Sequence, residues 1–293
     1  MEKILIDTDM GCDCDDVGAL AILCGAHNRK EAMLLGVTHA IDNPYGVRFI
    51  EKMLAYYGIG VPVGTCVKKG FINEERFDVF VKPLAADMPA KENPDSVKLM
   101  RKILSENRGV TLVTIGSYVN IAAFLQSEPD EISPLDGKML MAQSVSAVYS
   151  MGGHFTRPEY AEYNIKCDVH GAQTFAALCP VPVVYCGFEV GEKILTGAHL
   201  KDAAENPLLQ KAYGYYISRE CGVDSYLRPS WDPATVYAAI YQDENALFDY
   251  SDPVTVTFDE AGRTHFSEGG KDMYLTLETS EQTAAETLNK LMK

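Results

Sequence analysis

With 293 residues, the chain is long enough to bury a large core as one α/β domain or two smaller ones, and we expect a single domain over residues 1–293. Hydrophobic residues make up 47% and charged residues 23%, which excludes a disordered chain and is typical of a folded globular protein. The formal net charge of −15 disfavours nucleic acid as a partner and favours a metal cation or a small ligand, because a polyanion is attracted by clustered lysine and arginine.

The chain is expected to be cytoplasmic and to bind no membrane. Its first residues, MEKILIDTDMG, enter a strand-like run at once, which leaves no room for a cleaved signal peptide, and no apolar run is long enough to cross a bilayer. The eight cysteines should therefore stay reduced. Cys24, Cys179 and Cys186 lie in apolar runs and are expected to be small buried hydrophobes.

The N-terminal part of the chain alternates strand patterns with helix patterns. The segment KILIDTD predicts a buried strand, and the adjacent Asp15 and Asp16 are favoured at the start of a helix that continues through VGALAILCGAHNRK. The same order of strand, helix and strand is repeated at residues 31–40, 45–58 and 61–64. Residues 68–94 are the least regular, and we expect them to form a surface excursion.

Further strands are predicted at residues 109–117, 145–153 and 180–187, with a helix at residues 118–127. Apolar runs without alternation, each followed by a helical segment, are typical of parallel strands that are buried on both faces. We therefore expect an α/β fold with an open, mostly parallel sheet and helices on both faces.

The C-terminal part predicts a small β-hairpin excursion at residues 251–270 and a final helix with Thr279 and Gln282 as a capping box. In open α/β sheets, ligands bind at the carboxyl ends of the strands. One pocket is therefore expected to collect the polar and glycine-containing strand ends, at Asp7, Asp9, residues 39–43, Gly116 and residues 151–153.

The most informative stretch is DTDMGCDCDDVGAL, which follows a buried strand. It places five aspartates within ten residues, namely Asp7, Asp9, Asp13, Asp15 and Asp16. Five carboxylates so close repel one another, and in a partly desolvated pocket their ionised forms persist only if a cation offsets the repulsion. All-oxygen ligands suit hard cations, and several carboxylates on an adaptable loop favour Ca²⁺ over Mg²⁺. The alternative is a solvated acidic turn that caps the following helix.

Two other acidic motifs fit the stretch less well. An EF-hand would need a glycine where Cys12 or Cys14 stands. A haloacid-dehalogenase-like phosphatase also has two aspartates separated by one residue at a strand end, as Asp7 and Asp9 are, but Gly11 stands where that motif has Thr or Val.

At these residues the chain resembles the inosine-uridine nucleoside hydrolase family. That family's signature runs Asp, Thr, Asp, Pro, Gly, one residue, Asp, Asp, whereas this chain has Met10 in place of the proline and two extra residues before the acidic pair. Further resemblances follow in chain order at LLGVTHAIDN, LVTIGSYVNIA, VYSMGG, AEYNIKCD and SWDPATV. In the last, Trp231 takes the place of the histidine of a His-Asp-Pro motif.

The resemblance implies a Rossmann-like nucleoside hydrolase fold with a Ca²⁺ site. The ion would be held by Asp9, Asp16, Asp232 and the backbone carbonyl of Ile115, and Asp9 would also be the catalytic base. The residues implied to bind the substrate are Asp15, Asn43, Met151, Glu162, Asn164 and Trp231. The implied partner is a small-molecule nucleoside or N-riboside, and the implied assembly is a homo-oligomer, a dimer or a tetramer.

The resulting hypothesis is Ca²⁺-dependent hydrolysis of an N-glycosidic bond, which releases ribose and a free base. The ion would orient a water and lower its pKa, and a carboxylate would take the proton as the water attacks the anomeric carbon. Because the transition state resembles an oxocarbenium ion, the surrounding carboxylates would stabilise charge that forms during the reaction. Asp7 is expected to order the loop through backbone N–H groups, and Asp13 to face solvent.

Trp231 is the departure with the greatest chemical consequence, because indole cannot protonate a leaving base. It can stack on one, or it can be a core aromatic beside the metal ligand. The candidate replacement acids are His39, His154, Tyr226 and Arg228.

Two alternatives stay open: a calcium-loaded ribose-binding protein with little or no hydrolase activity, and a Mg²⁺-dependent phosphatase with an aspartyl nucleophile. The Cys12 and Cys14 pair is taken as incidental.

Overall fold

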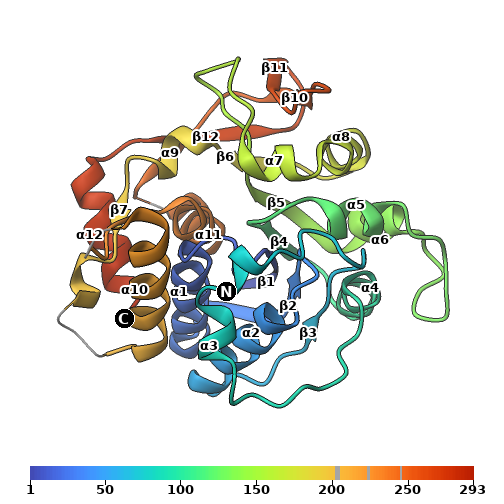
Figure 1. Cartoon of the computed structure of the whole chain (residues 1–293). Coiled ribbons are helices and arrows are strands. Elements are labelled where there is room, and N and C mark those ends of the chain that lie inside the picture. The colour runs from blue at the N-terminus through green and yellow to red at the C-terminus, as the bar shows by residue number, and fades with distance from the viewer. Residues whose placement is uncertain (202–204, 223–224, 245) are drawn as a thin grey trace.

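The computed structural model describes residues 1–201, 205–222, 225–244 and 246–293. Within these residues, the centre of the molecule is an eight-stranded sheet (Figure 1). In the order in which they lie, its strands are β3 (Val63–Gly64), β2 (Ala32–His39), β1 (Glu2–Thr8), β4 (Val110–Thr114), β5 (Val145–Met151), β6 (Val183–Cys186), β12 (Met273–Leu277) and β9 (Phe248–Tyr250). Neighbouring strands run parallel except for β12 and β9, so the expected open, mostly parallel sheet is confirmed.

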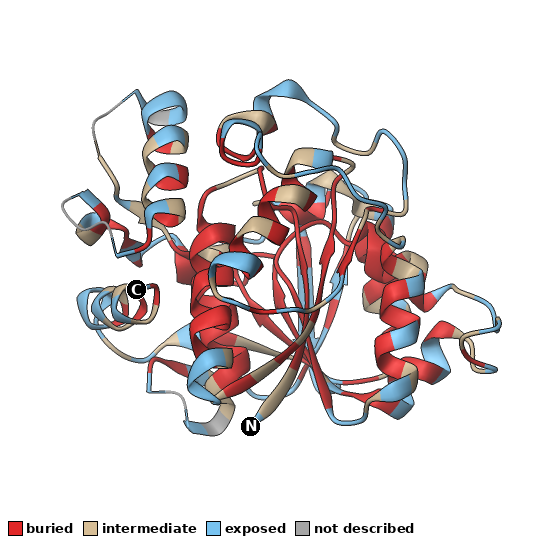
Figure 2. Cartoon of the chain, turned by 90° about the horizontal axis from the view of Figure 1, so that it is seen from below, coloured by how far each residue is buried: buried red, intermediate tan, exposed pale blue. Residues whose placement is uncertain are grey.

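Both faces of the sheet are buried, as the unbroken apolar runs predicted. Along β1, Ile4 and Ile6 belong to one hydrophobic cluster, whereas Leu5 between them belongs to another. Figure 2 shows the buried strands between two layers of helices whose outer surfaces are exposed. The sequence of β1 does not alternate, because each of its faces contacts helices rather than water.

The two helical layers come from different parts of the chain. Apolar residues of the first cluster lie on α1 (Asp15–Arg29), α2 (Pro44–Tyr56), α3 (Val81–Leu84), α9 (Phe188–Gly191), α10 (Pro207–Cys221), α11 (Trp231–Tyr241) and α12 (Glu281–Leu291). Those of the second lie on α4 (Ser96–Glu106), α5 (Val119–Leu125), α6 (Gly137–Ser144), α7 (Tyr163–Cys167) and α8 (Val169–Leu178). Three short 3-10 helices are described in addition, η1 (Glu75–Asp78), η2 (Ala198–Lys201) and η3 (Gln242–Glu244).

The irregular segment at residues 68–94 is more than a surface excursion. Phe80 and Val81 are fully buried in the first core cluster, and Phe49 packs edge-on against Phe80 with ring centroids 5.6 Å apart. Short elements with few apolar residues give a weak periodic signal, so the sequence pattern did not reveal this packing.

At the C-terminal end the expected hairpin is present, because β10 (Val254–Phe258) pairs antiparallel with β11 (Thr264–Glu268). The final helix is also confirmed, but its cap is Ser280, whose Oγ accepts from the Thr283 backbone N–H at 3.1 Å. The expected capping box at Thr279 and Gln282 is therefore wrong by one position.

A second two-stranded sheet joins two segments that are far apart in the chain. There, β7 (Leu195–Thr196) pairs antiparallel with β8 (Arg228–Pro229), which leads directly into α11. Among the described helices, none combines the length and apolar character needed to cross a membrane.

Candidate functional site

One cavity of about 260 Å³ collects nearly all of the residues singled out in the sequence. Those that line it are Asp9, Asp15, Asp16, Ile115, Met151, Glu162, Asn164, Trp231 and Asp232. Asn43 is the exception: its Oδ1 caps α2 by accepting from the Tyr45 and Gly46 backbone N–H groups, and its Nδ2 donates to Asp78 at 3.1 Å.

The acidic loop reaches the cavity because β1 ends there and the chain turns tightly into α1. The Thr8 hydroxyl donates to the Asp16 carboxylate and accepts from the Met10 backbone N–H, so it links the end of the strand to the start of the helix. Gly11 has a φ of +121°, and a Cβ there would lie 2.9 Å from the Phe77 carbonyl oxygen. Only glycine adopts this conformation readily, so the close turn depends on that residue.

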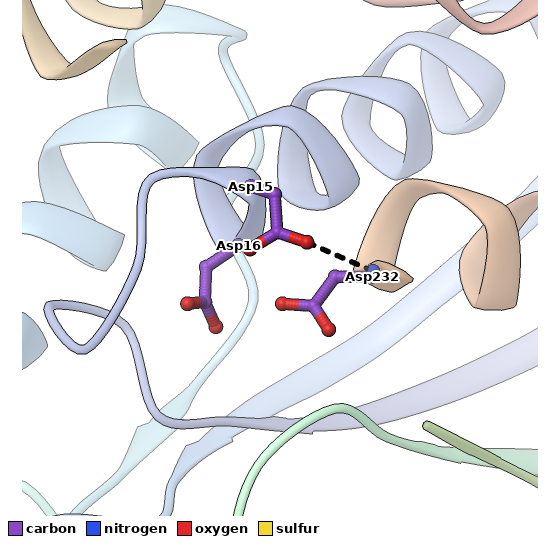
Figure 3. Close-up of side chains that lie close together, drawn as sticks. All are labelled: Asp15, Asp16 and Asp232. Atoms are coloured by element: carbon purple, nitrogen blue, oxygen red, sulfur yellow. Dashed lines mark hydrogen bonds between the residues drawn. The ribbon is translucent and has the colours of Figure 1, made fainter. Parts of the chain in front are cut away.

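Asp232 comes together with the adjacent Asp15 and Asp16 although more than two hundred residues separate it from them in the chain (Figure 3). One carboxylate oxygen of each lies within 4.8 Å of one from each of the other two, and Asp15 Oδ2 accepts from the Asp232 backbone N–H at 3.1 Å. All three side chains are buried at the first turns of α1 and α11. The positive ends of the two helix dipoles therefore meet at the cluster, where they favour negative charge.

The cluster has the features of a site for a hard divalent cation. Burial, and then the charges of neighbouring aspartates, raise the pKa values of Asp15, Asp16 and Asp232 well above the ordinary range. Asp16 Oδ2 is buried and has no hydrogen-bond partner among the described residues. Oxygen atoms grouped in this way fit Ca²⁺ or Mg²⁺, either of which would offset both the repulsion and the unmet hydrogen-bonding capacity.

Asp9 and Ile115 lie at the adjacent strand ends and line the same cavity, but Asp9 is outside the tight group of three carboxylates. A Cβ on Gly116 would lie 2.8 Å from the Asp9 backbone nitrogen, so only glycine lets the β4 turn approach so closely. Burial raises the pKa of Asp9 to about 7. In the metal-free protein, burial thus disfavours the ionised form of Asp9.

A second group of side chains comes from the end of β5 and the start of α7. Glu162 accepts from the backbone N–H groups of Asn164 at 2.9 Å and Ile165 at 3.2 Å, and burial raises its pKa to about 7. The Asn164 amide donates to the Met151 sulfur at 3.2 Å. These contacts fix the side chains of Glu162, Asn164 and Met151 where they line the cavity, which is suited to hydrogen bonding with the hydroxyl groups of a sugar.

Asp7 and Asp13 lie elsewhere than expected. Asp7 is fully buried, does not line the cavity, and accepts from the side chains of Thr38 at 2.5 Å and Asn120 at 2.8 Å, so it ties β1 to its neighbours rather than ordering the loop through backbone N–H groups. Asp13 does not simply face solvent, because it forms an ion pair with Arg228.

Three of the candidate replacement acids do not line the cavity. His39 is buried with Nε2 3.0 Å from the Met10 carbonyl oxygen, and burial lowers its pKa to about 4. His154 Nε2 accepts from Arg157 at 2.8 Å, and its Nδ1 lies 3.0 Å from a Glu189 carboxylate oxygen. Tyr226 packs near Gly214. Arg228 is the candidate that reaches the cavity.

Trp231 is half-buried beside Phe188, with ring centroids 5.1 Å apart, and its Nε1 donates to the Phe188 carbonyl oxygen at 2.8 Å. Asp13 and Cys12 also line the cavity, although Asp13 is expected from the sequence to face solvent and Cys12 to be incidental. The other lining residues were not identified from the sequence, and they are Arg76, Phe77, Tyr163, Phe188, Tyr216 and Glu220. Phe188 follows the end of β6, a position at which a ligand contact could have been expected. Tyr216 and Glu220 lie on α10 and carry no recognisable motif.

Comparison with known proteins gives a consistent result. The model of the family described as inosine-uridine preferring nucleoside hydrolase matches residues 4–291. No match is found among the curated proteins.

Solved structures of similar fold cover the whole chain. A purine-preferring ribonucleoside hydrolase from Gardnerella vaginalis has a TM-score of 0.74 at 18% identity, with 100% of this chain and 99% of that chain covered. An inosine-uridine preferring nucleoside hydrolase from Bacillus anthracis has a TM-score of 0.73 at 14% identity, with coverage of 100% and 99%. The type III effector XopQ, solved with adenosine diphosphate ribose, has a TM-score of 0.73 at 16% identity, with coverage of 100% and 93%. At these identities the likeness establishes a shared fold.

Proposed function

The chain belongs to the inosine-uridine preferring nucleoside hydrolase family and is an N-ribosyl hydrolase, and from this premise we propose that it cleaves a ribonucleoside or a related N-riboside with the help of Ca²⁺. The products are ribose and a free base. The observation that carries the proposal is the convergence of Asp15, Asp16 and Asp232 in one cavity.

In this proposal the ion is held by the carboxylates of Asp9, Asp16 and Asp232 and by the backbone carbonyl of Ile115. When bound, it supplies positive charge that lowers the pKa of a nearby water. Asp15, whose Oδ2 already accepts from the Asp232 backbone, accepts a hydrogen bond from a ribose hydroxyl through its other oxygen. Several carboxylates on the loop favour Ca²⁺ over Mg²⁺, since Mg²⁺ demands a stricter octahedral geometry.

The protein's own side chains carry the remaining steps. The Asp9 carboxylate, which lines the cavity at the end of β1, accepts the proton of the water that attacks the anomeric carbon. Glu162, Asn164 and Met151 bind the ribose, and the negative charge around it stabilises the oxocarbenium-like transition state. Trp231 stacks on the base and gives it no proton, because the single indole N–H donates to Phe188.

The test measures reducing sugar released from inosine, uridine and p-nitrophenyl ribofuranoside after treatment with EDTA, and again after Ca²⁺ or Mg²⁺ is restored. We expect turnover that EDTA abolishes and that Ca²⁺ restores better than Mg²⁺. Ribose binding without turnover of any riboside would favour a binding protein instead. Release of phosphate from phosphoesters would favour the phosphatase, although a nucleophile at Asp7 would be buried away from the cavity.

A further inference from the structure

Arg228 has no role in the chemistry described so far, yet it is the most firmly held cation in the cavity. Pairing of β8 with β7 places it there, and its Nε donates to Asp13 Oδ1 at 2.9 Å while its Nη2 donates to Asp13 Oδ2. Asp13 Oδ1 also accepts from the Cys14 backbone N–H at 2.6 Å. The carboxylate is thus fixed by the acidic loop and fixes the guanidinium in turn.

Two aromatic rings also pack against the Arg228 guanidinium. The Arg228 guanidinium carbon lies 5.2 Å from the centre of the Tyr216 ring and 5.3 Å from that of Trp231. Burial disfavours its charge, but the Asp13 carboxylate outweighs this and raises the pKa of Arg228 above the ordinary value, so the cation is permanent. Its side chain keeps 20% of its surface exposed, and its Nη1 has no hydrogen-bond acceptor among the described residues. The two N–H bonds of Nη1 therefore have no partner, in a guanidinium that lines the cavity and lies over the Trp231 ring.

The departing base needs a cationic group or a hydrogen-bond donor beside it. As the C1′–N bond breaks, both bonding electrons go to the ring nitrogen, and negative charge develops on the base unless an acid protonates it. The described lining of the cavity contains no histidine, and the Trp231 N–H is engaged. The other lining arginine, Arg76, pairs with Glu74 and keeps 57% of its side-chain surface exposed, so water screens its charge.

Resting on the proposed function, we propose that Arg228 contacts the leaving base and stabilises it as an anion through hydrogen bonds from Nη1, with Asp13 as its positioning residue. The guanidinium keeps its protons. Water supplies the hydroxyl of ribose, its proton passes to the Asp9 carboxylate and then to solvent, and the free base takes a proton from solvent. The substrates that fit are ribosides of heterocycles whose ring nitrogen or carbonyl oxygen carries the negative charge on departure.

The experiment compares Arg228→Gln with wild type, both saturated with Ca²⁺, on inosine and on p-nitrophenyl ribofuranoside. Because p-nitrophenolate leaves readily without help, kcat/KM for that substrate should fall less than about threefold, whereas kcat/KM for inosine should fall on the order of 100-fold. Arg29→Gln is the matched control, since Arg29 pairs with Glu31 through two hydrogen bonds at the far end of α1. It should leave both values unchanged.

Equal losses on both substrates in Arg228→Gln, or no loss on inosine, would overturn this inference while the proposed function stands. Wild-type protein that turns over neither riboside would overturn the proposed function and this inference with it. If the unpaired Asp13 prevents folding, the double variant Asp13→Asn, Arg228→Gln removes both partners and is expected to show the same selective loss. In Arg228→Ala, added guanidinium should restore inosine hydrolysis several-fold, and absence of this rescue would count against a direct contact.

Discussion

Replacing Asp232 with asparagine should have opposite effects on stability in the absence and presence of calcium. With one carboxylate oxygen of each residue no more than 4.8 Å from those of the other two, each charged pair repels by at least about 3.5 kcal/mol at an effective dielectric constant of about 20. Asp232→Asn removes this aspartate's repulsion with Asp15 and with Asp16. Because burial raises the pKa of Asp232, the metal-free folded state holds protons that the unfolded chain releases, so its stability falls as pH rises from the unfolded value of about 4 towards the raised pKa.

In EDTA, Asp232→Asn should therefore melt above wild type, and the difference should grow as the pH is raised. Calcium at about 100 times its Kd should stabilise wild type by about 2.7 kcal/mol, which corresponds to roughly 5 to 10 °C in Tm. The variant should gain little, because it has lost a carboxylate ligand. Calorimetric melts of wild type, Asp232→Asn and the exposed control Asp252→Asn, each with EDTA and with calcium, measure both effects. An equal gain from calcium in wild type and Asp232→Asn, or a less stable variant in EDTA, would refute the reasoning.

Two further predictions concern the substrate side of the cavity. Because burial raises the pKa of Glu162 to about 7, and its ionised form accepts hydrogen bonds from ribose, kcat/KM at saturating calcium should rise about tenfold from pH 6 to pH 8. Glu162→Gln should flatten that rise, and an unchanged profile would exclude this residue. Trp231→Ala should raise KM on the order of tenfold while Trp231→Phe, which keeps a stacking ring, changes it less. Equal KM values in the two variants would show that stacking on this ring does not bind the base.

Much of the fold could be predicted from the sequence because the signals are local. The run through Ile4, Leu5 and Ile6 is apolar on both strand faces, and β4 and β6 are likewise buried along their whole length with a helix after each. These local signals did not predict strand pairs whose members are far apart in the sequence. β12 inserts beside β6 from the C-terminal end, and the small β7–β8 sheet joins segments more than thirty residues apart, so neither is visible in local periodicity.

The candidate site also contains some residues that could be predicted from local motifs and others that could not. The resemblance assigned Asp9, Asp16, Ile115 and Asp232 to one site, and all four line the cavity. This was possible because each lies in a recognisable motif at a strand end or a helix start. Motifs say little about side chains that other side chains hold in place. Asn43 stands in a motif, yet its side chain caps a helix, whereas Asp13 lies in an insertion and is fixed by Arg228, whose approach depends on tertiary packing.

The most direct test of the central claim is a crystal structure of the protein soaked with calcium and ribose. The account predicts one ion bound through oxygen atoms of Asp16 and Asp232, with the ribose hydroxyl groups beside Asp15. Density for ribose with no ion between these two carboxylates, or an ion bound elsewhere on the chain, would contradict it.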